Sequence, residues 1–162
     1  MTMKQFHILQ FSTDIGTVQI TCTGKEILSF SLLESADTSA RHDRTDGGCE
    51  LCRMAKKQVL EYLNGRRKQF DLPLSFSGNA LQLSVWKALA EIPYGETVSY
   101  SELADAVHCR SIRAVGTAVG QNPLPIIIPC HRVIRKDGSI GNYSFGGPEI
   151  KRKLLTLESS HQ

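Results

Sequence analysis

Apolar residues in the first 33 positions come in three short runs separated by turn-forming residues. The runs are FHILQF, VQITCT and ILSFSLL, with turn signals around Gly16 and Gly24 between them. Short apolar runs bounded by glycine and polar residues are typical of β-strands joined by tight turns. The pattern therefore predicts a meander of three short strands.

The next segments predict a loop, a helix and an extended connection. Residues 35–48 are polar and end in two glycines, which indicates a loop or linker. Over residues 49–63 apolar side chains recur at helical spacing, so we expect a helix that packs on the strands. The stretch QFDLPLSFSGN then leads to Ser77, which divides the chain into two predicted domains, residues 1–77 and 78–162.

The second half changes to helical patterns. We expect helices over residues 81–91, 100–107 and 111–121, and Ser99 with Glu102 forms a capping box before the second of them. The second and third helices are joined by the short segment HCR. Such a pair occurs in helix-turn-helix DNA readers and also in ordinary helix packing.

The last third begins with PLPIIIPCHRVI, which predicts a short apolar strand, bounded by prolines, that carries a Cys-His pair at its end. A glycine-rich loop, GNYSFGG, follows. Proline is favoured at the first position of a helix, so Pro148 is expected to begin a final helix that runs to about Glu158. Its inward-facing residues are predicted to be Ile150, Leu154, Leu155 and Leu157.

The length of 162 residues fits one ordinary domain or two small ones. Its 41% hydrophobic and 22% charged residues are close to globular averages, which favours a folded, soluble protein over a disordered chain. No apolar run approaches the roughly 20 residues that cross a bilayer, and the start MTMKQFHILQ lacks a secretion signal. We therefore expect no membrane partner and a location in the cytoplasm or on DNA.

The net charge of +3 is compatible with a polyanionic partner without requiring one. Lysines and arginines are concentrated in the last third, so the second half is the better candidate for contacting phosphate. The five cysteines are an odd number in a chain that has no need of disulfides to supplement its core. This indicates free thiols in a reducing compartment.

Cys130 is the leading candidate for chemistry, because it follows the predicted strand and Pro129 and is flanked by His131 and Arg132. Only the thiolate is a strong nucleophile, and cationic neighbours can lower the pKa of a cysteine. The alternative is a buried structural cysteine beside a surface histidine. Adjacent side chains on a strand point apart, so His131 reaches the thiol only if the backbone bends or a water bridges them.

Two other patterns leave alternatives open. Cys49 and Cys52, with His42 upstream, suggest zinc or redox chemistry, although on a helix Cys52 also suits the core; we expect no metal. The segment RAVGTAVG is a helix faced with small residues that suits tight packing or close approach to DNA. Arg113 at its head favours DNA, because arginine can reach into a base stack or a phosphate.

These segments together resemble a known family. PCHRV preceded by Asn122-Pro123, the stretch IPYGETVSY and the segment RAVG are similar to the alkylguanine-DNA alkyltransferases, or methylated-DNA-protein-cysteine methyltransferases. The resemblance is strong over residues 81–158 and extends to residues 1–75 only in length and strand-helix order.

The resemblance implies an α/β plus mainly helical fold, with an N-terminal ribonuclease H-like sheet-and-helix domain and then a winged helix-turn-helix domain. It implies repair of duplex DNA by a single, irreversible transfer of an alkyl group from guanine oxygen-6 to Cys130, with thymine oxygen-4 as a second candidate. The nucleotide must be flipped out for this reaction. The implied protein is a cofactor-free monomer that is cytoplasmic, or nucleoid-associated or nuclear when it acts on DNA.

Carried over to this chain, the resemblance implies that Cys130 is the acceptor, that His131 is its base through a water, and that Glu158 orients His131. Asn122 would hold the active-site turn. Phe145 is an extra residue in the loop after Tyr143 and Ser144. The implied guanine donors and pocket walls are Tyr100, Ser144, Pro125, Val133 and Tyr143.

For DNA the resemblance implies that Arg113 fills the gap left by the flipped nucleotide. The helix face that includes Ala114 and Gly116 would lie in the minor groove, whose degenerate pattern suits repair at any sequence.

Three other functions fit parts of the sequence. A non-catalytic binder of alkylated DNA would accept no label from a methylated duplex. A hydrolase or thiol peroxidase using Cys130 and His131 would turn over many times. A transcription regulator would select a defined operator, but the sequence has no obvious dimerisation segment.

Overall fold

The computed structural model describes residues 5–33 and 49–162, which fall into two compact units, residues 1–76 and 77–162. The predicted loop at 35–48, and with it His42, lies outside the described residues. The described parts are mixed α/β, and none of their helices is long and apolar enough to span a membrane.

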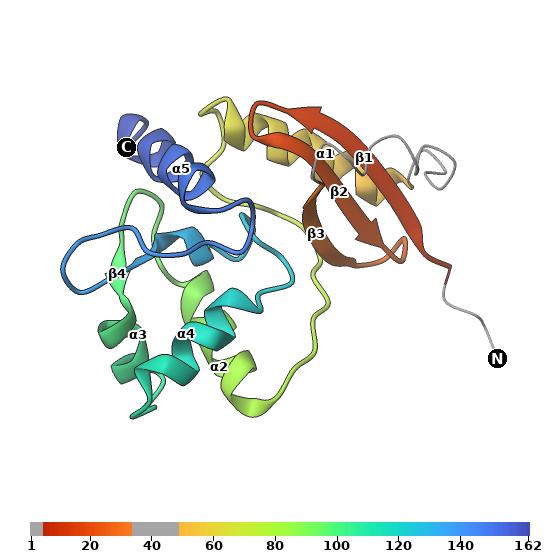
Figure 1. Ribbon diagram of the computed structural model, residues 1–162. Helices are drawn as coiled ribbons and strands as arrows, with labels where there is room; N and C mark the ends of the chain where they lie inside the picture. The colour runs from red at the N-terminus through yellow and green to blue at the C-terminus, as the bar shows by residue number, and fades with distance from the viewer. Residues whose placement is uncertain (1–4, 34–48) are drawn as a thin grey trace. The chain divides into compact units, whose positions relative to one another are not determined.

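The first unit contains the predicted meander, which is confirmed. Strands β1 (His7–Thr13), β2 (Gly16–Cys22) and β3 (Ile27–Leu33) form an antiparallel sheet in that order (Figure 1). Side chains of Val18, Ile20 and Cys22 alternate along β2 and are all buried. This period of two is what a half-buried strand requires, so one face of the sheet needs a cover.

The cover is α1 (Glu50–Leu63), the predicted helix, which contacts β1 and β2. Its buried residues follow the helical period and include Cys52, Ala55, Val59 and Tyr62. After the helix the chain runs extended, and Leu74 pairs with the first residue of β3 as an isolated parallel bridge.

The second unit contains the three predicted helices, α2 (Ala80–Ala90), α3 (Tyr100–Ala106) and α4 (Ile112–Gly120), each confirmed within a residue or so at its start. Local hydrogen bonds explain this agreement. The capping box predicted at Ser99 and Glu102 is present, and it satisfies two amides that the helix itself cannot pair.

The three helices pack on one another around an apolar core, and α2 and α4 also share a polar contact. The Trp86 indole donates a hydrogen bond to the Ala118 carbonyl at 2.9 Å. This bond satisfies the indole N–H inside the core. The turn between α3 and α4 is tight, and His108 has a left-handed φ of 56°.

The strand predicted over residues 123–134 is wrong. The chain there forms turns and then a short 3-10 helix, η2 (Cys130–Arg132), and only β5 (Val133–Ile134) is extended, pairing in parallel with β4 (Val98–Ser99). Prolines in this segment have no N–H to give to a sheet, and Ile126 has a φ of 75° that no strand can contain. The backbone bend that Cys130 chemistry needs is therefore present.

The final helix, α5 (Pro148–Ser160), begins at its predicted proline. Its inward face differs from the prediction, because Lys151, Leu154 and Glu158 are the buried residues. Ile150, Leu155 and Leu157 are only half-buried. Two charged side chains are fully buried on this face because the rest of the unit supplies their partners.

Candidate active site

Cys130 is buried at the start of η2 and lines a cavity of about 210 Å³. The other lining residues come from three other parts of the second unit. They are Tyr100 of α3, Gly116, Val119 and Gly120 of α4, and the loop residues Asn142, Tyr143 and Ser144. A nucleophile enclosed in this way is accessible only to a group that enters the cavity.

A buried network of charged side chains lies behind the cysteine. His131 Nε2 makes a very short contact with Oε2 of Glu158. The same carboxylate accepts hydrogen bonds from Arg132 Nε at 2.7 Å and Nη2 at 3.2 Å. Bidentate pairing with a guanidinium keeps a buried carboxylate ionised, and the ionised group holds the imidazole in one orientation.

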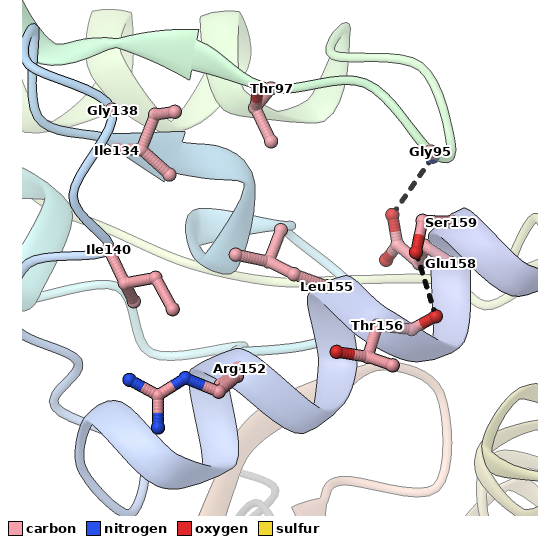
Figure 2. Close-up of a pocket in the computed structure, with 10 residues that line it drawn as sticks. All are labelled: Gly95, Thr97, Ile134, Gly138, Ile140, Arg152, Leu155, Thr156, Glu158 and Ser159. Atoms are coloured by element: carbon pink, nitrogen blue, oxygen red, sulfur yellow. Dashed lines mark hydrogen bonds between the residues drawn. The ribbon is translucent and has the colours of Figure 1, made fainter.

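Two backbone groups complete the network. The Gly95 amide donates to Glu158 Oε1 at 3.0 Å (Figure 2), and Arg132 Nη1 donates to the Ile92 carbonyl at 2.6 Å. Figure 2 draws Glu158 beside a second hollow of about 310 Å³, whose lining residues do not include Cys130. The smaller cavity, which contains the thiol, is therefore the candidate site for chemistry.

Lys151, and not Arg132, is the cation that acts on the thiol. Arg132 is occupied by Glu158, so it is not the cation that faces the thiol. Lys151 is fully buried on α5, where its Nζ donates to the Asn142 carbonyl at 3.2 Å and lies 5.8 Å from the ring centre of Tyr100. No sequence signal identified Lys151 as a site residue, although its spacing of seven residues from Glu158 places both on one helix face.

The resting state holds a thiol and a neutral imidazole. Burial raises the pKa of Cys130 to about 11, although the Asn122 side chain and the Lys151 ammonium favour the thiolate. Burial likewise lowers the pKa of His131, against the pull of Glu158. Burial lowers the pKa of Lys151 to about 8, while the negative charge that Cys130 can carry opposes this shift. The neutral imidazole is thus able to take a proton when the thiol gives one up.

Asn122 holds the turn that leads to the cysteine. Its Nδ2 donates to the Ile128 carbonyl at 2.8 Å, and its Oδ1 accepts the Leu124 amide at 2.9 Å. The two bonds close the segment that contains the left-handed Ile126. Pro125 and Val133 are buried near the same turn and do not line the cavity.

The residues predicted to contact DNA lie beside the cavity. An open hollow of about 630 Å³ shares Tyr100, Gly116 and Asn142 with it, and exposed Arg113 and Lys136 also line this hollow. Ala114, the next residue of α4, is half-buried. The extra residue Phe145 is buried edge-on against Tyr143, with ring centres 6.2 Å apart, and does not line the cavity.

Comparison with known proteins places the chain. The family description "6-O-methylguanine DNA methyltransferase, DNA binding domain" matches residues 80–160. A methylated-DNA–protein-cysteine methyltransferase of Mycobacterium tuberculosis is 40% identical over 156 residues, which are 95% of this chain and 93% of that protein. The chain belongs to the methylated-DNA–protein-cysteine methyltransferase family. The resemblance inferred from the PCHRV motif is thereby confirmed.

Two further relatives define the extent of the match. The inducible family member of Bacillus subtilis is 50% identical over 102 residues, which are 62% of this chain and 56% of that protein, so the chain spans little more than half of that relative. A crystal structure of the Mycobacterium tuberculosis OGT in complex with DNA is 40% identical. It has a TM-score of 0.85 and covers 96% of this chain and 94% of that one.

Proposed function

We propose that this protein repairs duplex DNA by transferring an alkyl group from guanine oxygen-6 to Cys130 in one irreversible event. The observation that carries the proposal is a buried thiol that lines a cavity and is followed directly by a buried His131–Glu158 pair. Membership of the methyltransferase family, and the DNA complex of a relative, support the same reaction. An alkyl group on thymine oxygen-4 is a second candidate substrate.

Activation begins with His131. With its proton on Nε2 donated to Glu158, the imidazole accepts the Cys130 proton at Nδ1 through a bridging water. Glu158 orients the ring and stabilises the imidazolium that forms. Lys151 stabilises the thiolate, because it is the cation that lowers the thiol's pKa. The nucleophile is therefore created on demand and not held as a permanent thiolate.

Transfer is an in-line displacement. The thiolate sulfur attacks the alkyl carbon, the S–C bond forms as the C–O bond breaks, and the electron pair stays on the guanine oxygen. Guanine gains a proton as it leaves, which balances the proton that Cys130 gives to His131, and hydrogen bonds donated by Tyr100 and Ser144 stabilise the leaving base. Cys130 becomes a thioether, which is a poor leaving group, so the protein reacts once and needs no cofactor.

Access to the lesion requires base flipping, because oxygen-6 is enclosed in the duplex. Exposed Arg113 fills the space that the flipped nucleotide leaves, while Ala114 and Gly116 let α4 approach the minor groove closely. Pro125, Val133 and Tyr143 support the pocket, and Asn122 holds its turn. We assign α3 and α4 to a winged helix-turn-helix domain and residues 1–77 to a ribonuclease H-like domain, in a protein that acts as a monomer.

Intact-mass measurement tests the proposal. The protein is mixed with a duplex that contains one O6-methylguanine, and we expect a gain of one methyl group that peptide mapping assigns to Cys130. A matched unmodified duplex serves as control. Binding to the methylated duplex without any mass gain would instead support a non-catalytic binder of alkylated DNA, and a label on another cysteine would refute the assignment of Cys130.

A further inference from the structure

Three cysteines converge in the first unit, whereas the residues of the proposed reaction all belong to the second unit. The sulfur atoms of Cys22, Cys49 and Cys52 all lie within 4.8 Å of one another. Cys22 Sγ and Cys49 Sγ are 3.0 Å apart, although 27 positions separate them in the sequence. Among the described residues this is the one group of three or more histidine, cysteine or acidic side chains that is close enough to share an ion.

Local structure directs each thiol to the same point. Cys49 is the N-cap of α1 and Cys52 follows three residues later, so both lie in the first turn of the helix. Cys22 ends β2, and the pairing of β2 with β3 shifts register between Thr21 and Cys22. The extra residue lies on β3, so Cys22 keeps the alternation of Val18 and Ile20 and faces α1 with them. Sheet and helix thus present their thiols to one another.

A candidate fourth donor lies on the same face of the sheet. His7 pairs with Cys22 across β1 and β2, so the two side chains lie on the same face of the sheet. The Cys52 thiol is 4.0 Å from the His7 carbonyl oxygen. A Cβ placed on Gly24 would lie 4.0 Å from His7 Nε2, which locates the imidazole beside the turn that follows Cys22.

We propose that Cys22, Cys49 and Cys52 form a zinc site, with the His7 imidazole as its fourth ligand. Soft thiolate donors select zinc among the common divalent ions of the cell, and tetrahedral sites of three cysteines and one histidine are a standard structural type. Zn–S bonds of about 2.3 Å set sulfur atoms roughly 3.8 Å apart, so small side-chain rotations suffice here.

The chemistry of binding also suits this position. Each thiol loses a proton to the solvent as its Zn–S bond forms, so three protons are released for each ion bound. The resulting centre carries a net negative charge, which the first turn of α1 favours. Cys22 and Cys52 are fully buried, whereas Cys49 is partly exposed and gives the ion a route of entry. The site would tie the end of the β1–β2 pair to the start of α1, and it does not depend on the proposed alkyl transfer.

Titration of the reduced, metal-free full chain with Co²⁺ tests the site. We expect thiolate-to-cobalt charge-transfer bands and the visible bands of tetrahedral Co²⁺ to saturate at one ion per chain, and Zn²⁺ to displace the cobalt. Cys49→Ser and Cys52→Ser should weaken binding by at least about 100-fold, because each loses a ligand. Cys109→Ser removes a cysteine outside the cluster and should bind as the wild type does.

A second experiment uses the wild-type protein, so its result does not depend on whether a variant folds. Zn²⁺ should protect the peptides containing Cys22, Cys49 and Cys52 from N-ethylmaleimide and leave Cys109 as reactive as before. His7→Ala should still bind Co²⁺, but with altered visible bands. Failure of the tetrahedral bands to appear in the wild type, equal protection of Cys109, or a Cys22–Cys49 disulfide that persists in reductant would each overturn the proposal.

Discussion

The two thiol regions of this protein differ in what surrounds the sulfur. Cys130 is enclosed and followed by a buried histidine-carboxylate pair, and burial raises its pKa to about 11. Cys49 is partly exposed, and although its burial raises the pKa, the Cys22 thiol and the nearby amides of Leu51 and Cys52 lower it to about 7. The cysteine that ionises more readily at rest is therefore not the one beside a base.

This contrast separates two requirements of a reactive cysteine. A low resting pKa helps a thiol that meets its electrophile or metal in water. A buried acceptor needs instead a group that removes its proton once the substrate is in place, and a cavity that excludes water from the thiolate. The following predictions test whether that group, the nearby cation and access to DNA set the rate at Cys130.

The largest effect is expected for Cys130→Ser. Serine keeps the cavity but offers a much weaker nucleophile, so methyl transfer from duplex DNA should fall by at least about 10⁵-fold. Single-turnover assays with labelled methylated duplex measure this rate. Cys109→Ser is the matched control and should keep the wild-type rate. Substantial labelling of Cys130→Ser would show that another cysteine serves as acceptor.

The second-largest effect on the rate is expected from loss of His131, the proposed general base. His131→Ala should slow transfer by about 100 to 10,000-fold, the usual contribution of a general base, with DNA affinity little changed because His131 is fully buried. Rate and affinity are measured on the same methylated duplex. If both fall in parallel, the histidine supports the fold and does not remove the proton.

Glu158 requires a gentler change than alanine. Removing its carboxylate leaves the buried Arg132 charge unpaired, which should cost about 3 to 5 kcal/mol of folding stability. Glu158→Gln keeps the shape, and we expect a slower transfer at a temperature where it remains folded. Glu149→Gln, an exposed change on the same helix, should have the wild-type rate and melting temperature. A full wild-type rate for Glu158→Gln would argue against an orienting carboxylate.

The cation beside the thiol is tested by Lys151→Met. Loss of an opposite charge should raise the pKa of Cys130 further and slow transfer by about 10 to 1,000-fold, with the rate-pH profile displaced to higher pH. Lys153→Met, an exposed change on α5, is the control. An unchanged profile would remove Lys151 from the mechanism.

The same variant has a stability signature. The pKa of Lys151 is about 8 in the folded protein and 10.5 in the unfolded chain. Between these pH values the unfolded chain binds more protons than the folded protein, so the contribution of Lys151 to the free energy of unfolding rises with pH. Below pH 8 Lys151 is charged in both states, so burial of its ammonium destabilises the folded protein by the full amount. The stability advantage of Lys151→Met over wild type should therefore be greatest below pH 8 and shrink towards pH 10.5, as denaturant titrations can measure.

The smallest effect is expected for Arg113, which lines the open hollow next to the cavity of Cys130. Arg113→Ala should slow repair of duplex DNA by about 10 to 100-fold, because flipping a paired base costs a few kcal/mol that the guanidinium partly offsets. Reaction with free O6-benzylguanine, which needs no flipping, should be nearly unchanged. Arg113→Lys should rescue only in part, since lysine lacks a planar stacking face.

A matched charge change controls for electrostatics. Arg110→Ala removes an exposed arginine just before α4, so it should weaken association with duplex DNA slightly while leaving transfer in bound duplex and reaction with the free base at the wild-type rate. If Arg113→Ala slows the reactions with duplex DNA and with the free base equally, the arginine supports the pocket and does not occupy the space left by the flipped nucleotide.

Local signals in the sequence were enough for most elements and for the family. The strands follow a period of two, and α3 begins where Ser99 and Glu102 pair with its own first amides. Such interactions involve residues close together in the chain, so they are visible before folding. The PCHRV motif likewise lies within five consecutive residues and identifies the acceptor cysteine as a candidate.

Tertiary structure decided the features that depend on distant partners. The apolar run at residues 123–134 resembles a strand, but the Asn122 clamp and a left-handed Ile126 bend it into η2. The spacing of apolar residues leaves Lys151 and Glu158 off the inward face of the last helix, and only the family resemblance implied that Glu158 contacts His131. In the fold, Asn142, His131 and Arg132 supply their hydrogen bonds. A buried charge is stable only where groups of opposite charge or hydrogen-bonding groups contact it. Here those groups come from elements that only the fold brings together.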